Sequence, residues 1–187
     1  MDTRQLLASA ALVGLAWAIW QRSQRDLAAN PAKPAVAAPS GAAGPNRYAA
    51  STQRRESAGD PLAKNPRSSA SGLYQFTRAT WLRLGGQWGP DPRKPFGGLT
   101  PSPAEQRQKF DQLTADNAAR LKGAGVKLTD GALYAAHFLG STGAVKVLKA
   151  PDAAPLAAFV GSATLAANPH LRGWTVGQFR AWTERSA

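Results

Sequence analysis

Apolar residues recur at helical spacing in the C-terminal part of the chain, most clearly between positions 103 and 123. One stripe of a helix here carries Phe110, Leu113, Asn117 or Ala118, and Leu121, which are apolar except for Asn117. The segment Ser102-Pro103-Ala104-Glu105 has the capping-box pattern that starts a helix, with proline at the first helical position. Gly123 follows the last apolar position, as is typical at a helix end. We therefore expect a helix from 103 to about 123.

Similar patterns predict further helices on both sides of this one. The expected ranges are 48–55, 77–84, 129–139, 144–149, 155–160 and a final helix that starts at a second capping box, Thr175-Val176-Gly177-Gln178. Turns are expected at Gly59-Asp60-Pro61 and Asn65-Pro66, and a break at Gly140. No series of alternating apolar and polar residues indicates strands. The fold class is therefore expected to be mainly α, in one domain over residues 47–187.

The N-terminal residues have a different pattern. Residues 6–20 are apolar and uncharged, which favours a transmembrane anchor within residues 1–26; a signal peptide ending near Ala16-Trp17-Ala18 is the alternative. Residues 27–46 are rich in Ala and Pro and are expected to form a linker. Arg22, Arg25 and Lys33 follow the apolar segment, and this charge bias favours a cytoplasmic C-terminal side.

The net charge of +12 favours anionic partners, which include anionic lipid, nucleic acid and acidic wall polymers. Nucleic acid is supported only by this charge, because no nucleic-acid-binding motif is present. The chain has no cysteine and only two histidines, and they form no pattern of metal ligands. We expect neither a metal nor another cofactor.

One carboxylate, Glu56, has no evident structural role. Glu105 and Asp130 stand at expected helix starts, Asp60 precedes a proline in a turn, and Glu184 lies near the C-terminus, where fraying is expected. Glu56 instead stands where a helix is expected to end, and a negative charge is unfavourable there. It is therefore a candidate for chemistry, with a surface ion pair to Arg54 or Arg55 as the alternative.

The motifs after Glu56 resemble those of the lytic transglycosylase family, and of its phage-type members in particular. They are Glu56-Ser57, GLYQFT at 72–77, LYAAHFLG at 133–140 and AANPHL at 166–171, and the resemblance covers about 48–171. It implies a lysozyme-like domain that cleaves the β-1,4 bond between N-acetylmuramic acid and N-acetylglucosamine in peptidoglycan. In such enzymes the sugar's own C6 hydroxyl attacks, which leaves a 1,6-anhydro end.

The resemblance also assigns roles to individual residues. Glu56 matches the general acid and base, and Tyr134 matches a tyrosine that orients it or steadies positive charge. Ser57, Gly72 and Gln75 match substrate-side positions, with turn or helix-flanking roles as the alternatives. His137 shares the helical face of Tyr134 and is assigned to the substrate side, although a structural role is favoured for it.

An acid at neutral pH must keep its proton, so Arg54 and Arg55 are expected to point away from Glu56. A hydrolytic muramidase that uses Asp60 or Asp91 as a second carboxylate remains an alternative, as does a non-catalytic peptidoglycan-binding protein. The expected location is a membrane anchor, either in a bacterial envelope facing the periplasm or in a phage virion that opens the wall for DNA entry.

Overall fold

The computed structural model describes residues 45–187, with side chains from residue 47 onward. The expected transmembrane anchor or signal peptide and most of the Ala/Pro-rich linker lie outside the described residues. Within the described part, no helix combines the length and the apolar character that a membrane span requires.

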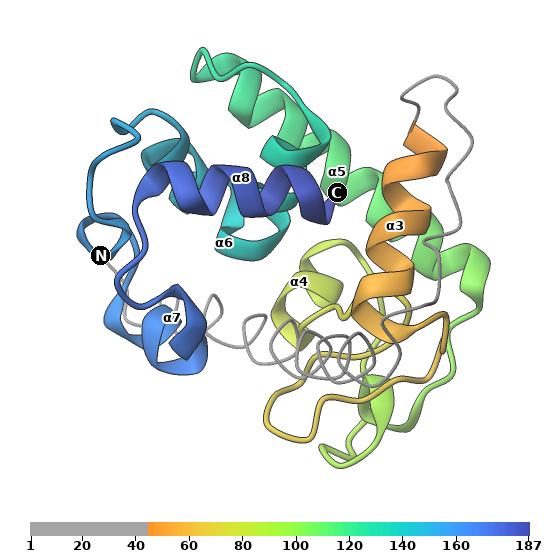
Figure 1. Cartoon of the computed structure of the whole chain (residues 1–187). Helices are drawn as coiled ribbons and strands as arrows, with labels where there is room; N and C mark the ends of the chain where they lie inside the picture. The colour runs from red at the N-terminus through yellow and green to blue at the C-terminus, as the bar shows by residue number, and fades with distance from the viewer. Residues whose placement is uncertain (1–44) are drawn as a thin grey trace, which may run out of the picture.

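The described residues are mainly helical, which confirms the expectation of a mainly α class (Figure 1). The α-helices are α3 (Pro45–Ser57), α4 (Arg78–Arg83), α5 (Pro103–Gly123), α6 (Asp130–Leu148), α7 (Ser162–Ala167) and α8 (Val176–Ser186). Three short 3₁₀ helices are η1 (Pro95–Gly98), η2 (Leu156–Ala158) and η3 (Pro169–Leu171). Residues 45–187 contain isolated β-bridges but no strand.

The starts of α5 and α8 are fixed by the capping residues that the sequence indicates. The hydroxyl of Ser102 accepts a hydrogen bond from the Glu105 amide, and Thr175 forms a complete capping box with Gln178. The expected break at Gly140 is present as a kink inside α6, where Gly140 has φ 72° and ψ 153°. These angles lie in a region that only glycine adopts readily, so the two expected helices join at this residue.

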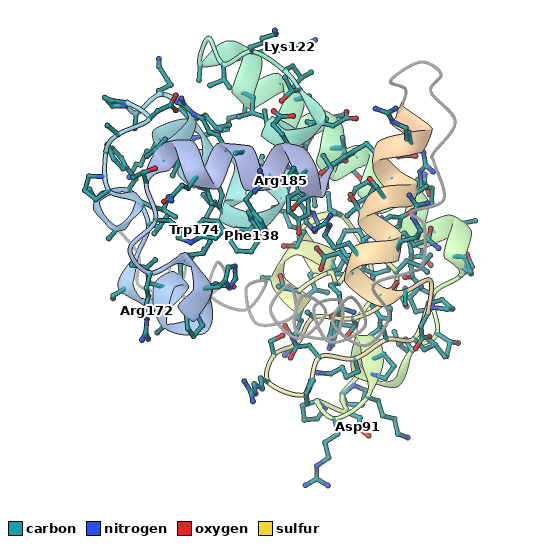
Figure 2. The ribbon with its side chains drawn as sticks, in the orientation of Figure 1. Asp91, Lys122, Phe138, Arg172, Trp174 and Arg185 are labelled. Atoms are coloured by element: carbon teal, nitrogen blue, oxygen red, sulfur yellow. The ribbon has the colours of Figure 1, made fainter. Side chains whose placement is uncertain are left out.

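Two hydrophobic clusters hold the helices together. The first lies mainly between α6 and α8, which cross each other in Figure 1, and includes Phe138, Phe179 and the half-buried Trp174 (Figure 2). The second joins α3, α4 and α5 through aromatic rings. Phe110 of α5 lies between Tyr48 and Tyr74, at ring distances of 5.5 and 4.1 Å.

Helix α6 contributes to both clusters and carries Tyr134 where they meet. The Tyr134 ring belongs to the second cluster and also lies 5.7 Å from the ring of Trp182 on α8. This junction places one face of α6 against the end of α3, which carries Glu56.

The expectation that Glu184 frays at the C-terminus was wrong. Its carboxylate accepts a 2.6 Å hydrogen bond from Thr129, the residue that caps α6. A Cβ atom on Gly131 would lie 2.3 Å from Glu184 Cδ, so glycine permits the close approach of α8 to the start of α6. Glu184 therefore has a structural role that its position near the chain end does not suggest.

Candidate active site

Glu56 occupies the last turn of α3 and is only 3% exposed. Helix α3 ends at the next residue, and Ala58 then takes a left-handed conformation with φ 55°. Burial raises the pKa of Glu56 from its ordinary value of 4.5 to about 7, because the charged carboxylate loses its hydration. The carboxyl group therefore keeps a proton in a large fraction of molecules at neutral pH.

His137 of α6 lies close to the Glu56 carboxyl. Its Nε2 atom lies 3.8 Å from Glu56 Oε1. Burial lowers the pKa of His137 to about 4, so the imidazole is neutral where the carboxyl titrates. Its Nδ1 atom is buried and has no hydrogen-bond partner among the described residues. The two groups are therefore both predominantly neutral between these two pKa values, and His137 carries no positive charge there that would favour ionisation of the carboxyl.

Tyr134 lies one turn before His137 on the same helix and approaches the same carboxyl. Its hydroxyl is buried, and it lowers the pKa of Glu56 by hydrogen bonding, an effect smaller than that of burial. Within the described residues, however, the hydroxyl has no partner that meets full hydrogen-bond geometry. Burial and the nearby Glu56 charge keep the pKa of Tyr134 well above its ordinary value, so it stays a neutral donor.

The expectation for the two arginines was correct for Arg54 and wrong for Arg55. Arg54 is exposed, and neither arginine forms an ion pair with Glu56 within the described residues. Arg55 is only partly exposed and is turned toward the site; its guanidinium lies 5.3 Å from the centre of the Tyr134 ring, a cation–π arrangement. Its charge lowers the pKa of Glu56, but the effect of burial is larger and the net shift remains upward.

Ser57 connects Glu56 to the loop that carries Gly72 and Gln75. Its hydroxyl lies 3.0 Å from the carbonyl oxygen of Leu73 and 3.1 Å from that of Gln53, and it accepts from the Gly59 amide. A hydroxyl can donate to only one of the two carbonyls at a time. Ser57 therefore positions the backbone around Glu56, and its hydroxyl forms no hydrogen bond with the Glu56 carboxyl.

Gly72 and Gln75 flank Leu73, the residue to which Ser57 is hydrogen-bonded. Gly72 has φ 77°, and a Cβ atom there would lie 2.3 Å from Gln106 Oε1 and 2.5 Å from the Phe96 ring. Gln75 is fully buried with φ 49°, and its amide nitrogen donates to the Gly72 carbonyl at 3.0 Å. Its side-chain oxygen is buried without a partner in the described part of the chain. The structure thus gives both residues packing roles and leaves one acceptor of Gln75 unsatisfied.

The other acidic residues considered for chemistry have structural partners. Asp60 and Asp91 accept backbone hydrogen bonds from the residues two positions later, as expected for turns. Asp130 stands at the first position of α6, and Asp116 pairs with Arg83 at 3.2 Å. No carboxylate is among the groups that shift the pKa of Glu56. Among the described residues, no cluster of His, Asp and Glu is arranged to hold a metal ion.

Two residues of the site were not found from the sequence. Tyr48, near the start of the same helix as Glu56, is buried, and burial raises its pKa above its ordinary value. Arg55 was expected only to point away from Glu56, and no contact with Tyr134 was predicted for it. The helical spacing of Tyr48, Arg55 and Glu56 could have indicated a shared face for the first two, which are seven positions apart.

The assembled site is a buried carboxyl group with a raised pKa, flanked by a phenol, an imidazole and one cation. Such a group can donate a proton at neutral pH and then act as a base once it is ionised. No protein-family model and no curated protein sequence matches the chain. The functional conclusion therefore depends on the site and on the motif resemblance.

Proposed function

We propose that the chain is a peptidoglycan lytic transglycosylase with a lysozyme-like domain. The observation that carries this proposal is the Glu56 carboxyl, which is buried and has a pKa of about 7. A general acid is most effective when its pKa lies near the working pH. The motifs around Glu56, Gln75 and Tyr134 supply the substrate class, the bond between N-acetylmuramic acid and N-acetylglucosamine.

In the first step, protonated Glu56 donates its proton to the glycosidic oxygen. The bond from C1 of the muramoyl sugar to that oxygen breaks, and positive charge develops on C1 and the ring oxygen. The neutral state of His137 avoids a competing cation near the developing charge. Tyr134 stays protonated and can donate to the Glu56 carboxylate as it forms.

In the second step, the Glu56 carboxylate accepts the proton of the C6 hydroxyl of the same muramoyl sugar. The C6 oxygen then bonds to C1, which gives the 1,6-anhydro end and restores protonated Glu56. No water is consumed. The turn roles of Asp60 and Asp91 support this route over a hydrolytic muramidase, which ordinarily needs a second carboxylate near the sugar.

The direct test measures turbidity loss of purified sacculi with the full-length chain. We expect the wild type to clear sacculi and Glu56→Gln to lower the rate by at least about 100-fold, since general acid catalysis contributes on this scale. Glu105→Gln is the matched control, because Glu105 lies at the start of α5 and should leave the rate unchanged. If the wild type binds sacculi without clearing them, the chain is instead a non-catalytic wall-binding protein.

Membrane attachment and location are part of the same proposal. Residues 6–20 would anchor the chain, and the basic residues after them favour a C-terminal domain that is made on the cytoplasmic side. A phage virion protein that meets the wall during DNA entry fits this bias better than an envelope enzyme facing the periplasm. A C-terminal fusion to a reporter active only in the periplasm distinguishes the two: activity supports the envelope enzyme.

A further inference from the structure

A groove of about 1020 Å³ lies between α5 and α6, with the end of α4 at its side; we call it the α5–α6 groove. Its floor includes the apolar side chains of Leu113, Ala136 and Val145. The kink at Gly140 gives α6 its bend beside the groove and places Ser141 and Thr142 in the lining. The groove is therefore an apolar trough with polar groups from both helices.

Positive charge predominates in this lining. Arg83, Arg120 and Lys146 contribute three cations, and Asp116 contributes one carboxylate. Asp116 pairs with Arg83 at 3.2 Å, and both side chains are about half exposed. Arg120 donates to the Thr142 hydroxyl at 3.3 Å, and neither Arg120 nor Lys146 forms an ion pair with a carboxylate of residues 47–187. Two cations are thus available to an anionic ligand.

His137 connects the α5–α6 groove to the catalytic carboxyl. It lines the groove and lies 3.8 Å from Glu56, whereas Glu56 and Tyr134 are not lining residues. The Nδ1 atom of His137 is buried without a hydrogen-bond partner in the described part of the chain. A ligand in the groove would therefore lie against His137, a residue 3.8 Å from the Glu56 carboxyl.

We propose that the α5–α6 groove binds the acidic peptide stem of the muramoyl sugar that reacts at Glu56. This inference rests on the proposed function. A stem peptide carries small apolar side chains and free carboxylates, which match the apolar floor and the two available cations. The described residues that line the groove include no Trp, Tyr or Phe, so it offers no flat aromatic face to a sugar ring. The peptide is thus a better match than the glycan itself.

Calorimetry on the full chain carrying Glu56→Gln separates binding from turnover. The probes are the disaccharide-peptide, the same disaccharide without its peptide, and a short single-stranded oligonucleotide. We expect the disaccharide-peptide to bind about tenfold more tightly than the disaccharide, as two charge-assisted contacts can provide. Adding Arg120→Gln and Lys146→Gln should remove this difference and leave the disaccharide affinity unchanged.

A matched control removes the same charge elsewhere. Arg93 and Arg172 are exposed and are not lining residues, and Figure 2 shows Arg172 at the edge of the molecule. Arg93→Gln with Arg172→Gln should keep the preference for the peptide. The proposal is overturned if the two double variants behave alike, if the disaccharide binds as well as the disaccharide-peptide, or if only the oligonucleotide depends on Arg120 and Lys146.

Turnover of peptide-bearing glycan strands by the wild type is measured separately. Cleavage without a peptide preference in binding rejects the groove inference and keeps the proposed function. A peptide preference that depends on Arg120 and Lys146, without cleavage, rejects the catalytic function and keeps the groove as a peptide-binding site. Thermal unfolding of each variant confirms that the exposed substitutions leave the fold intact.

Discussion

The Nε2 atom of His137 lies 3.8 Å from the Oε1 atom of Glu56, and both side chains are almost completely buried. Burial moves their pKa values in opposite directions, to about 4 for His137 and about 7 for Glu56. Between these values both groups are predominantly neutral, so the contact is not an ion pair there. This arrangement keeps a proton on the carboxyl group without any like-charged carboxylate beside it.

The first prediction concerns the pH dependence of activity. If protonated Glu56 is the acid, kcat/KM falls as pH rises through about 7, because the acid loses its proton. Arg55→Met removes the charge that lowers the pKa of Glu56, so this fall should move to higher pH. Arg54→Met is the control, since Arg54 is exposed, and its profile should match that of the wild type. An identical shift in both variants would refute the assigned role of Arg55.

The second prediction concerns stability. The pKa of Glu56 is higher in the folded state than its ordinary value of 4.5. The contribution of Glu56 to the stability of the wild type is therefore greatest below about pH 4.5, and it is lost as pH rises through about 7. The shift corresponds to about 3 kcal/mol. Glu56→Gln cannot ionise, so its free energy of unfolding relative to the wild type should rise by about this amount between pH 4 and pH 8. Denaturant unfolding at both pH values measures it.

A pH-independent difference in the free energy of unfolding between Glu56→Gln and the wild type would show that Glu56 titrates at an ordinary pKa.

His137 adds a separate pH effect on stability, of opposite sign. Its pKa is lowered, so its neutral form stabilises the fold above about pH 6.5, and this contribution is lost as pH falls through about 4. The comparison between the two chains cancels the His137 effect to first order, because both retain the imidazole.

The third prediction tests Tyr134. Tyr134→Phe removes the hydroxyl and keeps the ring between Trp182 and the Arg55 guanidinium. We expect kcat to fall by about tenfold to 100-fold and the pKa of Glu56 to rise, because the hydroxyl lowers that pKa. The free energy of unfolding should change by less than about 1 kcal/mol, since the hydroxyl has no partner with full hydrogen-bond geometry within residues 47–187. A large loss of stability with unchanged kcat would instead identify Tyr134 as a core residue only.

The fourth prediction concerns the loop that holds the end of α3. Gly72→Ala would place Cβ within 2.5 Å of Gln106 and Phe96 and would force alanine into a left-handed conformation. We expect a loss of about 2–4 kcal/mol in the free energy of unfolding. Gly123→Ala at the end of α5 meets no atom within 4 Å, and it should be neutral or slightly stabilising. Equal effects of the two substitutions would contradict the packing role of Gly72.

Local patterns were sufficient to predict most of the helices. Helix caps depend on side chains within three residues, so Ser102 and Thr175 identified the starts of α5 and α8 correctly. The break at Gly140 follows from the backbone freedom of a single residue. The short helices α7, η1 and η3 were not predicted, because they are one or two turns long and have no room for an apolar period.

Contacts between distant segments could not be predicted in this way. Arg55 turns inward because the Tyr134 ring is available to its guanidinium, and the sequence gives no indication of that pairing. Glu184 is ordered by Thr129 at the start of α6, 55 positions earlier. Elimination by local roles selected Glu56 as a candidate, but the burial that raises its pKa depends on contacts between distant segments, such as the one with His137 of α6.

The most direct test of the central claim is the mass of the muropeptides that the full-length chain releases from purified sacculi. We predict products with 1,6-anhydro-muramoyl ends, which are lighter by one water than reducing ends, and their loss in Glu56→Gln. Products that carry only reducing ends would show that water is the nucleophile, and release that persists in Glu56→Gln would show that Glu56 is not the acid.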